Sequence, residues 1–597
     1  MKTFTCIVAS MVLACSALPA WAAEPKYEVA FASFAPINSD IFLADADGSH
    51  ARPFLPDAEL DSNASFSPDG KWVLFTSRRA GTSDIYRSHL DGSGLEPLVA
   101  SPAYDDQAAL SPDGRSLAFV SSRGGQADIW ILDLASKAVR NLTHNPAGDF
   151  RPSWSPDGQW LAFSSDRESS HPRSPKGDFS IRHSTEIYVV KADGSSLRRI
   201  TQDGQFGGSP SWSPDGAKLA FYATTIEEVR NITSPMRLRG ISQIEVIDVE
   251  TGARQALTSG PGEKWSPHWL SSGKVGYVTG GPEGGVETIS GPSGARGEFN
   301  SPSWSADGRH MLFHREVDKT WPPDRRWISL DPRFALKRVG VFPSYSPSGD
   351  RRVSNDKTAG ILHNSILMMR ADGSQASVLF SDPQKSALAP SWSRQGDRIA
   401  FGLGQFFQGL QGPARADIAV IDTKGGGLRM LTQGGGNFGF PDWSPDGLHL
   451  VYRQAGAVRA LDILDLDTGA SRVLLSGPAH YNFPTWSPTG GVIAFTADID
   501  GDYEIYSIRP DGSDLKRLTR SPGNDAHSAW SPDGQWIAFA SGRGGFKDEA
   551  LLHPANPQPY GEIFVMRADG SQAHALADEP YEKGSPNWAP VGPPSGR

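Results

Sequence analysis

Short runs of alternating apolar and polar residues recur along the chain, each after the same turn signal. The stretch WSPDGQWLAFSSDR at 154–167 returns almost unchanged as WSPDGQWIAFASGR at 530–543. Alternation with a period of two predicts half-buried β-strands rather than helices. The Pro-Asp-Gly step predicts a tight turn, since proline presets one dihedral and glycine accepts the closing geometry. The pattern therefore predicts many short strands joined by turns.

The motif repeats along nearly the whole chain. Its aromatic position, with leucine in one copy, falls at Phe66, Leu110, Trp154, Trp212, Trp269, Trp304, Tyr345, Trp392, Trp443, Trp486, Trp530 and Trp588. The commonest spacing is 43 or 44 residues, which is typical of a propeller blade of four strands.

One copy predicts the blade strand by strand. An innermost strand ends at Phe66, a second covers 71–77, a third opens at Asp84-Ile85-Tyr86 and a fourth covers 95–99. Asp91-Gly92 marks the hairpin between the last two. This copy therefore contains a complete four-stranded unit.

The count of repeats predicts how the blades are grouped. Residues 27–55 read as three strands without an innermost one, and Trp588 ends an innermost strand that nothing follows. Propellers have four to eight blades, so twelve predict two rings. We expect an all-β protein of two tandem six-bladed β-propellers, covering 23–307 and 308–597. Residues 301–305 should then pair with 28–32 to close the first ring.

The repeats resemble the TolB-like (WD40-like) β-propeller family. The resemblance rests on the Trp-Ser-Pro-Asp-Gly copies, on strand starts such as Glu186-Ile187-Tyr188, and on Leu-Thr strand ends such as Leu518-Thr519. It implies the propeller fold and leaves the function open, because one propeller fold hosts many functions. TolB carries an α/β domain before its propeller. Here strands are expected directly after the N-terminal segment.

The N-terminus predicts export. Lys2 precedes an apolar stretch over 4–18, and Ala20-Trp21-Ala22 matches a cleavage site. We therefore expect 1–22 to be a signal peptide and the mature protein to be periplasmic or secreted. An alternative is a lipoprotein anchored through Cys15. No later apolar run is long enough for a transmembrane segment.

Composition narrows the chemistry further. The only two cysteines, Cys6 and Cys15, lie in the expected signal peptide, so a mature chain would contain no thiol nucleophile or thiolate metal site. The full chain has 57 Lys and Arg against 67 Asp and Glu. Nucleic acid binding needs a basic face, so we expect no nucleic acid partner.

The sequence offers no motif for catalysis. It contains no Gly-x-Ser-x-Gly elbow, no phosphate-binding Gly-rich loop and no His-Glu-x-x-His. His310 and His314 share one face of a strand, which we expect to be solvated. The acidic stretch 498–504 could hold calcium, but it aligns with a plain hairpin at 122–128, so we expect no metal or other cofactor.

Long loops remain as the candidate binding surface. Five connections of one type are extended, at 166–185, 223–242, 315–326, 402–416 and 542–561, and we expect their face to recognise a partner. The candidate contact residues are Phe406, Phe407, Trp321, His480 and His527, because aromatic anchors often dominate binding energy. The opposite face, which carries the Ser-Pro-Asp-Gly turns, is expected to be structural.

Together these patterns predict an exported scaffold that binds a protein or cell-envelope component, and not an enzyme. Two alternatives stay open: a propeller-type polysaccharide lyase or hydrolase using a ring mouth, and a small-ligand sensor domain. A lyase would need histidines clustered at one mouth, whereas His268 falls in the first expected ring and His480 and His527 in the second. The sequence does not specify the ligand or the oligomeric state.

Overall fold

The computed structural model shows a chain built from strands. The residues it describes are 25–33, 35–36, 38–167, 185–202, 206–225, 241–281, 283–291, 293–318, 326–356, 364–405, 415–433, 436–549, 561–579, 581 and 583–589. Across these ranges every regular element is a β-strand. In the same ranges no helix is long and apolar enough to cross a membrane.

The strands fall into two groups of six blades, each written here from its innermost strand outward. The first group comprises β4 (Asp61–Phe66), β5 (Trp72–Ser77), β6 (Asp84–His89), β7 (Glu96–Val99); β8 (Asp105–Leu110), β9 (Ser116–Ser121), β10 (Asp128–Asp133), β11 (Val139–Asn141); β12 (Asp149–Trp154), β13 (Trp160–Ser165), β14 (Glu186–Lys191), β15 (Arg198–Arg199); β16 (Phe206–Trp212), β17 (Lys218–Thr224), β18 (Gln243–Asp248), β19 (Arg254–Ala256); β20 (Lys264–Trp269), β21 (Val275–Thr279), β22 (Gly285–Thr288); and β23 (Asn300–Trp304), β24 (His310–Asp318), β2 (Asn38–Asp45), β3 (Arg52–Pro53).

The second group comprises β27 (Val341–Tyr345), β28 (Arg351–Asp356), β29 (Ser365–Arg370), β30 (Ser377–Phe380); β31 (Ser386–Trp392), β32 (Arg398–Gln405), β33 (Arg415–Asp422), β34 (Arg429–Met430); β35 (Asn437–Trp443), β36 (His449–Ala455), β37 (Ala460–Asp465), β38 (Ser471–Ser476); β39 (Tyr481–Trp486), β40 (Ile493–Ala497), β41 (Glu504–Ile508), β42 (Lys516–Arg517); β43 (Asp525–Trp530), β44 (Trp536–Ser541), β45 (Glu562–Arg567), β46 (His574–Ala575); and β47 (Lys583–Ala589), β1 (Tyr27–Ser33), β26 (Phe334–Val339), β25 (Arg326–Trp327).

Contacts between innermost strands close each group into a ring. In the first, β4, β8, β12, β16, β20 and β23 contact one another in that order, and β23 contacts β4 again. In the second, β27, β31, β35, β39, β43 and β47 do the same, and β47 contacts β27. The all-β fold with blade-like sheets is therefore confirmed, with three described strands rather than four in the blade that begins with β20.

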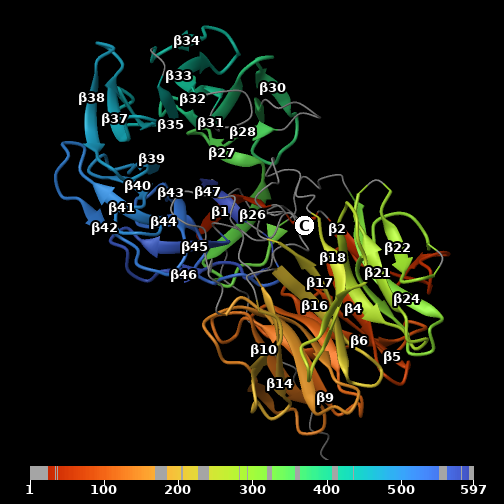
Figure 1. The fold of residues 1–597 in the computed structure, drawn as a ribbon. Coiled ribbons are helices and arrows are strands. Elements are labelled where there is room, and N and C mark those ends of the chain that lie inside the picture. Colours follow the sequence, from red (N-terminus) through yellow and green to blue (C-terminus); the bar gives the residue numbers. More distant parts are fainter. Residues whose placement is uncertain are drawn as a thin grey trace, which may run out of the picture.

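Ring closure differs from the expectation. Strand β1 pairs with β47, with Val29 opposite Trp588, and on its other side lies parallel to β26 (Figure 1). Strand β2 instead joins β24 in the first ring. The predicted pairing of 301–305 with 28–32 is wrong, and the chain does not divide at residue 307 into two contiguous propellers. It starts in the second ring, crosses to the first, and returns.

The side chains of β1 explain why this strand lies in the second ring. Val29 and Phe31 are fully buried, and they pack in one cluster with Trp588 and Leu336. Phe31 also meets Trp327 edge to face, with ring centroids 5.5 Å apart. The strand thus supplies core residues between the last innermost strand and β26.

The repeated turn has the geometry that its sequence predicts. In the first copy, the Ser67 hydroxyl donates to Asp69 at 2.7 Å and accepts the backbone N–H of Trp72 at 2.9 Å. Gly70 adopts a φ of +69°, which a residue without a Cβ reaches at little cost. Hydrogen bonds from Ser67 and from the backbone of Lys71 lower the pKa of Asp69, so the carboxylate is held ionised in the turn.

The motif tryptophans fasten one blade to the next. The indole N–H of Trp154 donates to the carbonyl of Ala109 at 3.0 Å, and that of Trp212 donates to the carbonyl of Ser153 at 3.1 Å. Each acceptor lies on the innermost strand of the preceding blade. These indoles therefore serve in inter-blade packing and hydrogen bonding.

A buried ion pair recurs in four blades and was not anticipated from the sequence. An Asp at the start of the innermost strand binds an Arg eighteen residues later, after the second strand. The pairs are Asp61–Arg79 (3.0 Å), Asp105–Arg123 (2.7 Å), Asp149–Arg167 (2.7 Å) and Asp525–Arg543 (2.7 Å). All four carboxylates are fully buried, and each pair ties the inner strand to the turn beyond its neighbour.

Truncation of a β1 side chain should open the second ring. We expect Phe31→Ala to cost about 3–5 kcal/mol, as for other buried phenylalanines. Hydrogen exchange should then show lost protection in β47 and β26, with β12 unaffected. Phe163→Ala, which removes a fully buried ring from the first propeller, is the control and should act on β12 instead. Loss of protection in β23 with Phe31→Ala would contradict the observed closure.

Candidate functional site: the two central channels

One residue per blade points to each central channel from a β-bulge. It lies three positions before the motif aromatic, at a shift of register between the first two strands. In the first ring these residues are Asn63, Gln107, Arg151, Ser209, Ser266 and Ser301, with φ between 45° and 57°. In the second ring they are Phe342, Ala389, Phe440, Phe483, His527 and Ser585, with φ between 47° and 57°. The same left-handed conformation thus presents polar side chains in one ring and mostly aromatic ones in the other.

The first channel opens on the face that carries the Ser-Pro-Asp-Gly turns. A cavity of about 510 Å³ lies there, and all six innermost strands line it. Its wall includes prolines such as Pro152 and Pro210 together with motif tryptophans, and the six polar bulge residues lie deeper. His268 also lines it, stacked on Trp304 with centroids 5.6 Å apart, and burial lowers its pKa to about 4.

The opposite mouth of the first channel is closed by a segment of the second ring. Lys547, Asp548 and Glu549, which follow β44, are 4%, 2% and 0% exposed. Asp548 pairs with both edge nitrogens of Arg151, including Nε at 2.9 Å. We call residues 547–549 the plug. Because the bulge residue Arg151 contacts it directly, the first channel is open at one end only.

The second acidic residue of the plug binds hydrogen-bond donors of the first ring. Glu549 accepts the Ser164 hydroxyl at 2.5 Å and the Ser209 backbone N–H at 2.6 Å. Burial raises the pKa of Glu549 against the opposing charge of Arg151. Burial disfavours the charge on Arg151 too, but the carboxylate of Asp548 outweighs it and raises the pKa of Arg151. The plug is therefore held by charge-assisted hydrogen bonds between groups that are buried away from water.

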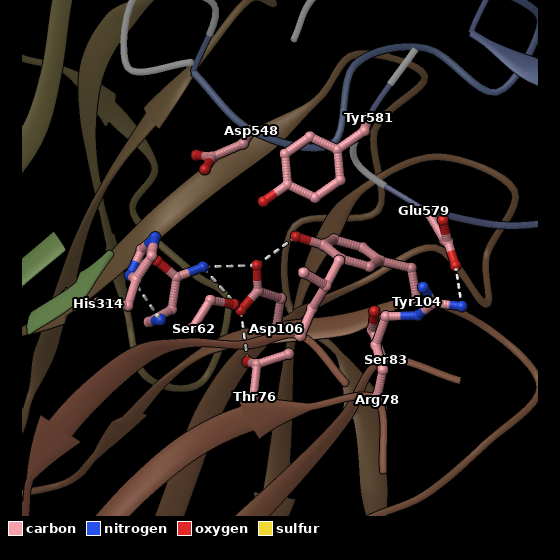
Figure 2. A pocket seen from close by; sticks show the side chains of 12 residues that line it. Ser62, Thr76, Arg78, Ser83, Tyr104, Asp106, His314, Asp548, Glu579 and Tyr581 are labelled. Carbon is pink, nitrogen blue, oxygen red and sulfur yellow. Dashed lines mark hydrogen bonds and ion pairs between the residues drawn. The ribbon is translucent and has the colours of Figure 1, made fainter. Parts of the chain in front are cut away.

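Residues 578 and 579, which follow β46 in the same blade as the plug, also contact the first ring at this closed mouth. Asp578 accepts the Ser122 hydroxyl at 2.5 Å, and Glu579 pairs with Arg78 of the first ring. Figure 2 shows Asp548, Glu579 and Tyr581 facing Asp106 and Arg78 across a small space. This enclosed cavity has about 20 Å³, which is room for one water molecule.

Asp106 is the polar centre of that enclosed space. It is 2% exposed and accepts hydrogen bonds from Asn63 Nδ2 at 2.7 Å, from the Thr76 hydroxyl at 2.5 Å and from the Tyr104 hydroxyl (Figure 2). Burial, followed by the charge of Asp106, raises the pKa of Tyr104 well above its usual value. The phenol therefore stays protonated and donates to the carboxylate.

The expectation for His314 is wrong. This side chain is 4% exposed and lines the same enclosed cavity, and its Nδ1 lies 3.4 Å from the Asn63 backbone nitrogen. The position is equivalent to Thr76 of another blade, since each lies ten residues after its motif aromatic, and both side chains face the closed mouth of the first channel rather than solvent. Among the described residues no three His, Asp or Glu side chains are placed to hold a metal ion.

Aromatic rings from several blades meet in the second channel. Phe440 and Phe483 meet with centroids 4.5 Å apart, Phe483 and His527 at 3.9 Å, and Phe342 and His527 at 5.7 Å. Burial among these rings lowers the pKa of His527 to about 3, so the imidazole is neutral at ordinary pH. Four blades thus meet through one aromatic cluster.

The structure describes two of the five predicted contact residues. His527 lies in the aromatic cluster, whereas His480 lies where β39 begins and pairs through Nδ1 with Asp498 at 2.9 Å. Phe406, Phe407 and Trp321 lie outside the described residues, as do most of the five long loops. The role of all five residues in binding stays a prediction.

The acidic stretch 498–504 has separate protein partners. Asp498 holds His480, Asp500 accepts the Tyr506 hydroxyl at 3.0 Å, and Glu504 binds Arg517 at 2.7 Å. Calcium binding at this stretch stays an untested alternative. The bulge residues were missed by sequence reasoning, although their constant distance from the motif aromatic would have located them.

The fold and its channels define a double β-propeller with one open and one aromatic channel. The TolB β-propeller family model matches residues 98–172 and 407–592. An uncharacterised protein of Agrobacterium fabrum is 35% identical over 302 residues, which are 49% of this chain and 82% of that protein. The chain belongs to the TolB-like β-propeller family.

Two further comparisons are more limited. A Tol-Pal system protein TolB of Desulfosudis oleivorans is 43% identical over 61 residues, or 10% of this chain. The chain spans 14% of the length of this relative and 34% of the length of a TolB homologue of Chlorobium luteolum. The crystal structure of TolB from Acinetobacter baumannii is aligned over 82% of both chains at 14% identity, with a TM-score of 0.27.

Breaking the plug contact should destabilise the protein. Asp548→Asn leaves the buried Arg151 charge without its partner, which costs about 3–5 kcal/mol of unfolding free energy. Replacing both residues, as Arg151→Met with Asp548→Leu, should recover most of the loss in denaturant unfolding. Glu96→Gln, in an exposed pair with Arg87, is the matched control and should cost under about 1 kcal/mol. Equal effects of Asp548→Asn and Glu96→Gln would contradict the role given to the plug.

His527 should make the protein sensitive to acid. Its pKa is lowered from 6.5 to about 3 on folding, so between those values the unfolded chain binds a proton that the folded chain does not. Its contribution to stability is present above pH 6.5 and is lost as the pH falls toward 3. His527→Phe should therefore lose less stability between pH 7 and pH 4 than the parent protein, as measured by urea unfolding.

Phe483 of the same aromatic cluster supplies the control for that comparison. Phe483→Leu disturbs the packing around His527 but removes no titratable group, so it should leave the pH dependence as in the parent. An equal change of the pH dependence in both variants would show that packing, and not the protonation of His527, causes the acid sensitivity.

Proposed function

We propose that this protein is an exported propeller that binds a protein of the cell envelope through the open channel of its first ring. The observation that carries the proposal is the 510 Å³ cavity on the turn face, to which all six blades contribute. Large concave surfaces with apolar walls and a few polar groups are the usual form of binding sites. Proline and tryptophan walls above polar bulge residues have this composition.

Two further observations support a binding role. One family relative is named as a Tol-Pal system protein, and the proposal carries a role in such a system over to this chain. In addition, the plug leaves the turn face as the open end of the channel. A partner segment entering there would reach Gln107 and Ser266 without displacing the plug.

Export is part of the proposal and rests on the N-terminal pattern of Lys2, the apolar stretch and Ala20-Trp21-Ala22. The long-loop face, with Phe406 and Phe407, remains the alternative recognition surface. The two candidate surfaces are made of different residues and can be tested separately.

Filling the open channel should abolish partner binding. Ser266 lies at a bulge with φ of 49°, the conformation in which Phe483 lies in the second ring, so Ser266→Phe is compatible with the backbone. An envelope protein captured by cross-linking would be purified, and its dissociation constant measured. Ser266→Phe should weaken binding at least about tenfold, because it occupies space that the partner needs.

The second ring provides a matched control. Ala389→Phe places the same side chain at the equivalent bulge of the other channel and should leave the affinity unchanged. Loss of binding with Phe406→Ser and Phe407→Ser, and not with Ser266→Phe, would move the recognition surface to the long-loop face.

A further inference from the structure

The second ring contains a guanidinium group that lies over its central aromatic cluster, and this group has no acidic partner among the described residues. Arg453, on β36, is half-buried and lies over the Phe440 ring with its guanidinium carbon 4.8 Å from the centroid. Its Nη1 donates to Asn482 Oδ1 at 3.1 Å and its Nη2 to Asn437 Oδ1 at 3.2 Å. Both acceptors are neutral amides, so the charge is not compensated by them.

This environment differs from that of the buried arginines that form ion pairs in this protein. Arg151, Arg78 and the four arginines of the repeated ion pair each bind a carboxylate. Asp498 follows β40, next to the strand that carries Asn482, but it is held by His480. Burial lowers the pKa of Arg453 to about 10, which is the consequence of a charge removed from water without a carboxylate beside it.

The hydrogen-bonding capacity of Arg453 is also incompletely used. A guanidinium has five N–H donors, and two have protein acceptors here. Its buried Nε has no partner in the described structure, and neither has the buried hydroxyl of Thr496, which lies opposite Asn482 in the β39–β40 ladder. Buried polar groups left unsatisfied are costly, and a bound ligand is one way in which such groups gain partners.

The first ring shows what a channel guanidinium of this protein binds. Arg151 donates to Asn63 and Ser301 with one nitrogen and directs its other edge at the carboxylate of Asp548. Arg453 likewise has amide oxygens on its terminal nitrogens, and the carboxylate is the missing component. The ring of Phe440 beneath it offers an apolar contact for the part of a ligand next to its acid group.

We infer that Arg453 anchors a second binding site, which takes a carboxylate group attached to an apolar or aromatic moiety. The carboxylate would lie against the guanidinium, within reach of Thr496, and the moiety would pack on Phe440 and Phe483. This site belongs to the other ring and does not depend on the proposed function of the first. The carboxylate could come from a free organic acid or from an acidic side chain of a peptide.

Calorimetric titration of the full-length protein with phenylacetate tests the inference. Phenylacetamide, which has the same shape without the charge, is the control ligand. Saturable binding of phenylacetate should be about 10- to 100-fold tighter than that of phenylacetamide, as charge-assisted hydrogen bonds predict. Absence of saturable binding by phenylacetate and by the acidic peptide below, up to about 10 mM, would overturn it.

Variants assign the binding to Arg453. Arg453→Gln should lose about 10- to 100-fold in affinity for phenylacetate and keep its affinity for phenylacetamide. Arg453→Lys should lie between the two, because it retains the charge but not the paired donors. Arg472→Gln, an exposed arginine that donates to Pro510, is the matched control, and an equal loss there would refute the assignment.

Stability measurements separate a ligand anchor from a structural residue. Removing an uncompensated charge should leave the melting temperature of ligand-free Arg453→Gln unchanged or raised. A lowered melting temperature together with unaltered phenylacetate binding would show that Arg453 only joins the blades, against the inference.

A peptide arm distinguishes the two sources of the carboxylate. The blocked dipeptide Phe-Asp, acetylated and amidated so that its side chain is the only acid, is compared with Phe-Asn. Tighter binding of Phe-Asp than of phenylacetate would support the site and identify a protein side chain as its ligand. Tighter binding of phenylacetate would support the site and identify a free organic acid.

Discussion

Ring closure is the constraint on which this structure depends. A propeller made of successive repeats ends with an innermost strand that must find a partner, because an unpaired strand edge exposes backbone groups and invites aggregation. In this protein the innermost strand β47 pairs with β1, and β24, the second strand of its blade, pairs with β2. Each ring is therefore closed by a strand from the beginning of the chain. Closing both rings from one terminal segment requires the chain to cross between them, first after β1 and again after β24. The two rings are therefore joined covalently at two places and share one folding requirement.

This double crossing brings the rings close enough to share a polar interface. The plug of Lys547, Asp548 and Glu549 leaves the last complete blade of the second ring and reaches the channel of the first. Removing charges from water is expensive, so such contacts are tolerated only where each charge has partners. Asp548 with Arg151 and Glu579 with Arg78 satisfy that condition. The consequence is a channel with one open end, and that asymmetry decides which face can admit a partner.

The repeat pattern was the part of the fold that could be predicted. All twelve motif positions, from Phe66 to Trp588, lie on innermost strands, because the aromatic side chain, the turn and the alternation after it are local properties. Closure could not be predicted in the same way. The strand containing Val29 and Phe31 has the same alternation as any blade strand, and nothing local states which ring it joins. The plug could not be predicted from the sequence either, because Asp548 and Glu549 bind partners that lie almost four hundred residues away in the sequence.

The two channels show how one backbone device can serve different chemistry. In both rings a bulge turns one residue per blade toward the axis in the left-handed conformation, and this conformation is costly for a residue with a side chain. The register shift between the first two strands imposes this left-handed conformation in all twelve blades. Its energetic cost is therefore a property of the fold and is not evidence for a particular ligand. The side chain at that position is then free to vary. Asn63, Gln107 and Arg151 make the first axis polar, whereas Phe440, Phe483 and His527 make the second aromatic. A duplicated scaffold with differing axes is suited to two distinct ligands, since each channel can change without disturbing the closure of the other.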